Sequence, residues 1–342
     1  IMVITGLGFT LWSGFSQYRA LTHGVTVIRG HYDDPDDPGA INHFQALSTA
    51  LSATVGLGNI GGVAIAISLG GPGAVFWMWI IGFLGMATKL TEVTLSMLYR
   101  NTDDEDNPHG GPMYVVSKGL KKRFPGSGPL GSIIGGLFCI TCLIMAATGG
   151  NMFQAWNVGT ITQEYFDIPS VASGIVLALV VGMVIIGGIK RIGSVTGRLV
   201  PIMVTLYFIA AIYVLIVNFA SIPAMFALIF QGAFSTLDAS GAFIGGTMGY
   251  AFLFGMKRAV FSNEAGQGTA PIAHSAAKTR EPVREGIVAG LEPFIDTIVV
   301  CTLTALVILS TGIWQRGACL LYTSPSPRDL GSNLVCRLLL VK

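Results

Sequence analysis

Four glycines and one asparagine stand at the centre of an apolar stretch, in the octapeptide VGLGNIGG at residues 55–62. The glycines weaken a helix here, and the Asn59 amide is costly to bury without hydrogen-bond partners. Together they favour a broken helix whose unwound backbone N–H and C=O groups bind a ligand. The positive end of a half-helix suits a carboxylate, while free carbonyls and the Asn59 oxygen suit Na⁺. The octapeptide therefore predicts a site for a small zwitterion and a cation.

The same octapeptide matches two other glycine patterns. Residues 56–61 fit the GxGxxG dinucleotide fingerprint, but a preceding strand, a βαβ unit and a downstream acidic residue are not found in the sequence around it. Gly58 and Gly62 form a GxxxG pair that would let another helix approach closely, which leaves Asn59 unexplained.

The elements that must position this site are membrane helices. The 342 residues are 52% hydrophobic and only 11% charged, with a mean hydropathy of +0.67, which is too apolar for a soluble globule. Continuous apolar runs without a period of two predict an all-α, multi-pass membrane protein rather than a barrel. We expect a short surface helix over 222–234 and about eight membrane helices, near 1–20, 44–68, 73–99, 130–158, 170–189, 199–220, 242–265 and 286–313.

Basic residues alternate between the loops and predict the orientation. The loops 69–72, 159–169 and 221–241 contain neither Lys nor Arg, whereas the loops between them carry the basic residues. Basic loops stay on the cytoplasmic side, so we expect the helix over 44–68 to run from inside to outside. The net charge of +2 then reflects orientation and gives no sign of a nucleic-acid partner. The basic loop residues are Arg19, Arg29, Arg100, Lys118, Lys121, Lys122, Arg123, Lys190, Arg191, Arg198, Lys278, Arg280 and Arg284.

Other chemistry finds little support in the sequence. The histidines stand singly and CITC, at residues 139–142, has no second ligand pair, so we expect no metal held by these side chains. Paired catalytic carboxylates and a nucleophile with a base are also not found in the sequence, which disfavours a membrane enzyme. Residues 317–342 change composition abruptly and resemble translated sequencing adaptor, so we expect the transmembrane domain to cover 1–316.

Several motifs resemble known transporter families. VGLGN, at residues 55–59, is similar to the start of the broken first core helix of the neurotransmitter:sodium symporters. The chain resembles the alanine or glycine:cation symporter family more closely, from residue 44 to 314. The motifs that carry this resemblance are FQALSTALSATVGLGNIGGVA, GGPGAVFWMWIIGFLGMATKLTEVTLSMLYR, HGGPMYVVSKGL, KRAVFSNEAGQGTAPIAHSAA and EPFIDTIVVCTLTALVILSTG.

The resemblance implies a leucine-transporter-like fold with two five-helix inverted repeats and an extra N-terminal helix, here truncated at the C-terminus. By this likeness, backbone amides around Leu57, Gly58 and Asn59 would bind the substrate carboxylate. Carbonyls near Ser52, Thr54 and Val55, with the Asn59 side chain, would bind Na⁺.

Further polar and glycine residues are secondary candidates. Gln154 and Asn151 would line the substrate cavity or cross-link helices, and Gly255 would be a break point in the seventh helix. Lys257 and Arg258 would cap the inner half of that helix or lie along the inner pathway. Lys89 and Glu92 favour a mutual ion pair, while Glu292 and Asp296 are expected at the membrane interface, with a second cation contact as the alternative.

The resemblance implies sodium-coupled symport of alanine or glycine across the inner membrane of a bacterium, with Na⁺ as the coupling ion and no organic cofactor. The partners are then a small neutral amino acid and the lipid bilayer, with protein partners unknown. Proton coupling remains an alternative to sodium coupling. A non-functional truncated fragment is the other alternative, because a ten-helix core needs about three helices beyond Trp314.

Overall fold

The computed structural model describes residues 2–234, 247–312 and 314, and in this part of the chain the regular structure is helical. Two isolated bridges, Ile41 with Ala277 and Asn101 with His109, are the β-type pairings found there. The all-helical class is confirmed. The suspected tail at 317–342 and the first residues of the expected helix 242–265 lie outside the described residues.

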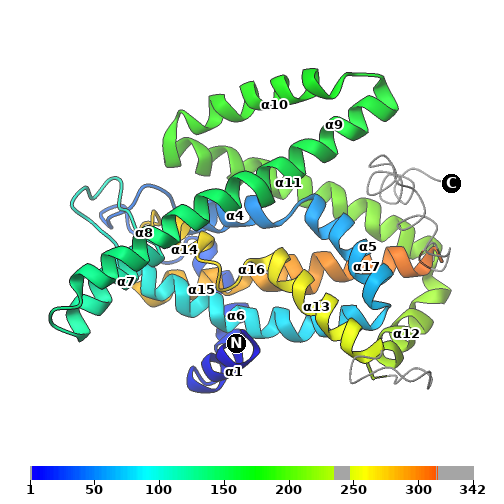
Figure 1. The fold of residues 1–342 in the computed structure, drawn as a ribbon, viewed down its shortest axis with the longest axis horizontal. Coiled ribbons are helices and arrows are strands. Elements are labelled where there is room, and N and C mark those ends of the chain that lie inside the picture. Colours follow the sequence, from blue (N-terminus) through cyan, green and yellow to red (C-terminus); the bar gives the residue numbers. More distant parts are fainter. Residues whose placement is uncertain (1, 235–246, 313, 315–342) are drawn as a thin grey trace.

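Most of the helices follow one another closely, and the longer described connections are 29–42 and 100–111 (Figure 1). In chain order they are α1 (Met2–Trp12), α2 (Ser16–Arg19), η1 (Ala20–Gly24), α3 (Val25–Ile28), α4 (His43–Thr54), η2 (Gly58–Gly62), α5 (Val63–Gly70), α6 (Gly73–Tyr99), α7 (Pro112–Arg123), α8 (Gly128–Met145), η3 (Ala146–Met152), α9 (Phe153–Phe166), α10 (Ser170–Ile185), α11 (Gly188–Val217), η4 (Phe219–Ser221), α12 (Ile222–Phe234), α13 (Thr247–Asn263), α14 (Thr269–His274), α15 (Pro282–Ala289), α16 (Leu291–Pro293), η5 (Phe294–Val300) and α17 (Cys301–Ser310).

Fewer of these helices have the length of a membrane span than the sequence predicts. Within the described residues, four are long and apolar enough to cross a membrane, and five if the bent pair α4 and η2–α5 counts as one span. The expected helix over 1–20 is wrong, because α1 ends after 11 residues and the left-handed Gly14 (φ 61°) and Phe15 (φ 57°) separate it from α2. The expected span at 170–189 is the 16-residue α10. The four spans are Gly73–Tyr99, Gly128–Phe166, Gly188–Val217 and Pro282–Ser310.

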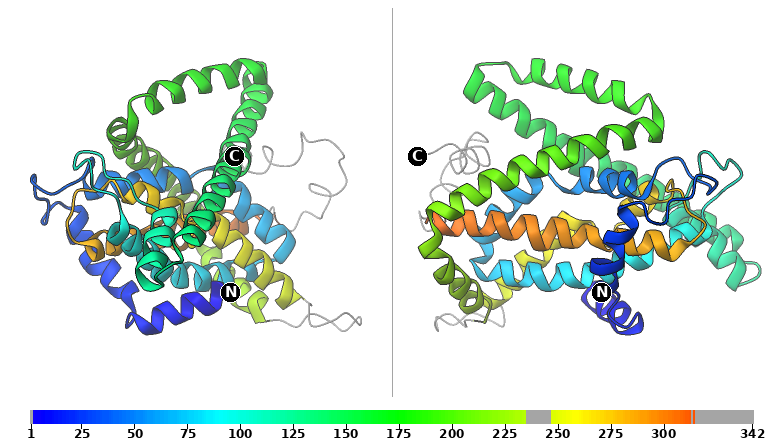
Figure 2. Two further views of the ribbon diagram at one scale, coloured as in Figure 1. Left: turned by 60° about the vertical axis from the view of Figure 1, so that its left-hand side comes forward. Right: turned by 180° about the vertical axis from the view of Figure 1, so that it is seen from behind.

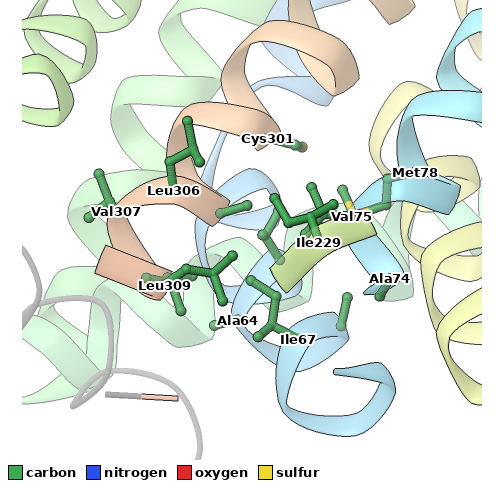
Figure 3. Close-up of a cluster of buried hydrophobic side chains, with 14 of the residues drawn as sticks. Ala64, Ile67, Ala74, Val75, Met78, Ile229, Cys301, Leu306, Val307 and Leu309 are labelled. Carbon is green, nitrogen blue, oxygen red and sulfur yellow. The ribbon is translucent and has the colours of Figure 1, made fainter. Parts of the chain in front are cut away.

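The molecule has a packed bundle and an arch. Helices α4, α5, α6, α13 and α17 lie together, whereas α8 to α11 form an arch in which α10 stands away from the bundle (Figure 2). The bundle core joins α5, α6, α12 and α17, and its residues include Ile67, Met78, Ile229 and Leu309 (Figure 3). Small residues allow this packing, since a Cβ on Gly73 would collide with the backbone of Gly232.

The basic loops meet at one end of the bundle. Arg100 follows the last residue of α6 and donates to the carbonyls of Pro38 (3.2 Å), Ser275 (2.9 Å), Ala277 (2.8 Å) and Thr279 (2.5 Å). Burial lowers the pKa of Arg100 from its usual value. These bonds tie the loops before α4, after α6 and before α15 together, as their charge pattern requires if they share one side of the membrane.

Candidate functional site

The helix break predicted at residues 55–62 is confirmed. A capping box starts α4, in which Asn42 Oδ1 accepts from the Gln45 amide at 2.8 Å and Gln45 Oε1 from the Asn42 amide at 3.2 Å. The helix ends at Thr54, Val55 is extended (φ −82°, ψ 109°), and the second half, Gly58–Gly70, leaves at an angle of 55°. The break therefore brings the C-terminal end of one half-helix to the N-terminal end of another.

Asn59 holds the two halves in this geometry. Its Oδ1 atom accepts a hydrogen bond from the Gly56 amide at 2.9 Å, and its backbone amide donates to the Gly56 carbonyl at 3.0 Å. This closed turn satisfies backbone groups that the missing helical turn would otherwise leave without partners.

The same asparagine points its amide nitrogen into a cage of oxygen atoms, with the Cys301 sulfur at its edge, 3.4 Å from Nδ2. Asn59 Nδ2 donates to Asp296 Oδ1 at 2.6 Å and to Ser262 Oγ at 3.2 Å, and lies 3.4 Å from the Asp296 carbonyl oxygen. Ser262 and Thr297 donate to Asp296 Oδ2 at 2.5 and 2.9 Å. These four side chains are at most 1% exposed. Oxygen atoms around a carboxylate form the environment that hard cations prefer.

A cavity of about 470 Å³ lies beside the broken helix. Gly58 and Gly62 of η2 form one wall, η3 and α9 form the second, and α13 forms the third. The walls are mostly apolar and include three phenylalanine rings, with Arg258 and Lys257 as the charged members. The lining residues are Gly58, Gly62, Ile65, Ala66, Thr148, Gly149, Phe153, Phe254, Lys257, Arg258 and Phe261.

The structure brings some of the secondary candidates to the break and not others. Gln154 lies against it, since a Cβ on Gly56 would be 3.3 Å from Gln154 Nε2. Asn151 is exposed in the π-helical η3, whereas Gln154 is half-buried in α9. Their roles in binding remain predictions.

The break expected at Gly255 is wrong, because α13 runs as one helix from Thr247 to Asn263. Gly255 instead provides room for α6, since an added Cβ would collide with the Ala74 carbonyl and lie 2.8 Å from Trp77 Cβ. Packing explains this glycine, and its proposed contact with substrate remains a prediction.

The carbonyls expected to bind Na⁺ lie at the end of α4. The Val55 amide donates to the Leu51 carbonyl at 2.8 Å. The carbonyls after Leu51 lie at the C-terminal end of α4, where a helix provides no amide donor for them. The Thr54 hydroxyl is buried and donates to Leu51 at 3.4 Å, while Ser52 is exposed and donates to Thr49 at 2.6 Å. Their part in ion binding remains a prediction.

The acidic residues of the last span are buried, which corrects the expectation that they lie at the interface. Glu292 and Asp296 are both 0% exposed because α16 and η5 lie inside the bundle. Glu292 Oε2 lies 3.2 Å from Lys89 Nζ, closer than Glu92, whose Oε1 is 3.9 Å from the same atom. Lys89 thus pairs with both glutamates.

Asp296 and Arg258 are functional candidates that the sequence reasoning left in minor roles, and Ser262 joins them in the structure. A carboxylate and a guanidinium in apolar membrane helices were a usable signal, because ionisable residues there are costly and mark function. Their convergence on Asn59 was not readable, since 199 or more residues separate them from it along the chain. In the described part of the chain, groups of three or more His, Cys, Asp or Glu able to hold a metal ion are not found.

Comparison with known proteins gives the family. The profile of the sodium:alanine symporter family matches residues 1–326. The chain belongs to the sodium:alanine symporter family. This family consists of membrane transporters rather than enzymes, and it couples amino acid symport to sodium or another cation.

Relatives in this family are prokaryotic. The sodium/alanine symporter AgcS of Methanococcus maripaludis is 44% identical over 92% of this chain and 67% of its own length. The putative sodium/proton-dependent alanine carrier protein YrbD of Bacillus subtilis is 37% identical, over 93% and 63% respectively. The probable sodium/glutamine symporter GlnT of Bacillus subtilis is also 37% identical, over 90% and 62%. The chain spans about two thirds of the length of these relatives.

Proposed function

We propose that this chain forms the ion- and substrate-binding part of a sodium-coupled symporter for a small neutral amino acid, alanine or glycine. The observation that carries the proposal is the position of Asn59. Its side chain enters the oxygen cage, while the neighbouring Gly58 lines the cavity. One backbone turn therefore connects a cation site to a substrate site.

The cage supplies the chemistry for the coupling ion, which is a transported substrate. Asp296 Oδ1, the Asp296 carbonyl and Ser262 Oγ surround the position that Asn59 Nδ2 holds. When Na⁺ binds, the Asn59 amide turns to present its oxygen, and the ion takes the place of the N–H donors. The carbonyls at the end of α4 near Ser52, Thr54 and Val55 complete the ligand set.

The amino acid binds in the cavity with its carboxylate near the backbone amides of Leu57, Gly58 and Asn59, at the positive end of Gly58–Gly70. Because the Asn59 side chain also accepts from the Gly56 amide, its rotation toward Na⁺ changes the backbone turn that the carboxylate contacts. The bundle then rocks around this site in the manner of a leucine-transporter-like fold to expose it inward. The substrate and coupling ion are expected to cross the inner membrane of a bacterium.

Uptake of labelled alanine into proteoliposomes containing the full gene product tests the proposal. Uptake should require an inward Na⁺ gradient, and glycine should compete while leucine should not. Asp296→Asn should raise the sodium concentration for half-maximal uptake by about 100-fold, because removing a buried charge partner costs about 3 kcal/mol. The control Asp167→Asn changes an exposed turn residue whose left-handed conformation Asn tolerates. Sodium-dependent uptake that is unchanged in Asp296→Asn would rule out the cage.

Proton coupling is the second candidate, and the buried carboxyl of Asp296 is the observation that favours it. A carboxyl in this position has the chemistry to carry a proton in place of Na⁺. Uptake driven by a pH gradient in sodium-free choline buffer, and abolished in Asp296→Asn, would select this alternative.

A further inference from the structure

Arg258 lies directly against the broken helix. It belongs to α13, one helical turn before Ser262, so both side chains face η2. A Cβ added to Gly58 would be 3.3 Å from its Nη2 atom, and one added to Gly62 would be 2.5 Å from its Nη1 atom. The two glycines of the GxxxG pair therefore make room for a guanidinium.

This guanidinium is buried and lacks polar partners among the described residues. Arg258 is 6% exposed, and its Nε and Nη2 atoms have no hydrogen-bond acceptor in that part of the chain. The Phe261 ring, 5.3 Å away, covers one face of the side chain. Asp296 acts on Arg258 through its charge, but both Asp296 side-chain oxygens already accept from Asn59, Ser262 or Thr297. A buried arginine without acceptors is costly and indicates a missing anion.

The position of Arg258 identifies the chemistry of that anion. Arg258 lines the cavity together with Gly58 and Gly62, where the N-terminal amides of Gly58–Gly70 begin. A guanidinium binds a carboxylate through two parallel hydrogen bonds, and the end of the half-helix adds favourable charge. The apolar walls around it, including Phe153 and Phe254, suit a small side chain and offer no competing carboxylate.

We propose that Arg258 binds the carboxylate of the transported amino acid in this cavity. The inference rests on the proposed function and goes further, because it makes a side chain rather than backbone amides alone responsible for selecting an α-carboxylate. It also separates the charges of the loaded site. Na⁺ neutralises Asp296 in the cage, and the carboxylate neutralises Arg258 in the cavity.

Binding of labelled alanine to the purified full gene product in sodium buffer tests this proposal. With wild-type protein, alaninamide, which lacks the carboxylate, should compete at least about 10-fold less well than glycine, since charged hydrogen bonds contribute about 1.5–3 kcal/mol. Arg258→Gln should weaken alanine binding by about 10- to 100-fold and reduce that discrimination. The alanine affinity of Arg258→Lys should fall between those of wild type and Arg258→Gln, because lysine keeps the charge but cannot form two parallel hydrogen bonds with a carboxylate.

Sodium binding separates this role from a structural one. Without amino acid, Arg258→Gln should bind ²²Na⁺ at least as tightly as wild type, because a positive charge near Asp296 is removed. The matched control Arg198→Gln, on the exposed face of α11, should leave both binding reactions unchanged.

The outcomes distinguish the inference from the function on which it rests. Unchanged alanine binding in Arg258→Gln, with alaninamide still a poor competitor, would overturn the role of Arg258 alone and leave the carboxylate to the backbone amides. Equal competition by alaninamide and glycine in wild type would overturn carboxylate recognition in this cavity, by Arg258 and by the amides. If Arg258→Gln loses ²²Na⁺ binding as well, Arg258→Lys decides the question. Retained ²²Na⁺ binding with weakened alanine binding in Arg258→Lys supports the inference, and loss of both contradicts it. Absence of sodium-dependent binding of alanine, glycine and glutamine by wild type would overturn the proposed function and the inference together.

Discussion

At the residue scale, adjacent glycines in the broken helix have different tasks. Gly62 faces Arg258, whereas a Cβ on Gly61 would have no heavy atom within 4 Å. Gly62→Ala should push the guanidinium away from the cavity and weaken alanine binding by about tenfold, because overpacking costs about 1–3 kcal/mol. Gly61→Ala is the matched control and should bind like wild type. Equilibrium binding of labelled alanine to both purified variants measures the difference.

Equal loss of binding in the two variants would contradict this assignment. It would mean that backbone flexibility across the whole GNIGG segment, rather than room for Arg258, decides affinity. Equal retention would show that the guanidinium moves freely and that its place over Gly62 is not needed for binding.

The same residues show how far the sequence leads. Glycine spacing and Asn59 predict the break, because low helix propensity and a buried amide are local properties. Asp296 and Arg258 reach Asn59 and Gly58 only through tertiary packing, which no local pattern encodes. The prediction at Gly255 was wrong for a related reason. In sequence, a glycine that makes room for a neighbouring helix cannot be distinguished from a glycine that breaks the helix it belongs to.

At the element scale, the pair Lys89 and Glu292 joins α6 to the last span. Both side chains are 0% exposed and their charged atoms are 3.2 Å apart. Lys89→Met should destabilise the protein by about 3–5 kcal/mol, because Glu292 is left buried without its ion-pair partner. Lys89→Met combined with Glu292→Leu should recover most of this loss, since an apolar pair needs no compensating charge. Thermal unfolding of the detergent-solubilised wild type, Lys89→Met and the double variant measures these differences in stability.

The nearby Glu92 provides the control for this pair. It is 15% exposed and 3.9 Å from Lys89, so Glu92→Gln alone should cost less than Lys89→Met. A double variant as unstable as Lys89→Met would instead show that the lysine serves a purpose other than balancing Glu292. The sequence expectation for Lys89 is incomplete, because the i,i+3 spacing predicts only the longer of its two ion-pair contacts.

At the scale of the whole molecule, the length of α11 determines how far apart the basic loops and the turn η4 lie. Near its start, Lys190 Nζ lies 3.8 Å from Asp106 Oδ1 of the loop that contains Glu105. Its 30 residues lead to the turn η4, which contains Ala220. A helix of this length is about 45 Å long, more than the hydrocarbon core of a bilayer. The basic loops and η4 should therefore lie on opposite sides of the membrane.

Single cysteines at Glu105 and Ala220, both exposed, test this arrangement in a background without other cysteines. In intact cells, a membrane-impermeant maleimide should label Ala220→Cys directly and Glu105→Cys only after the inner face is opened, because basic loops stay inside. Labelling of both from outside would place the two ends of α11 on one side and contradict its role as a span. The reverse labelling pattern would keep α11 as a span but invert the orientation of the protein in the membrane. The ions and substrate would then reach Asn59, Asp296 and Arg258 from the opposite side.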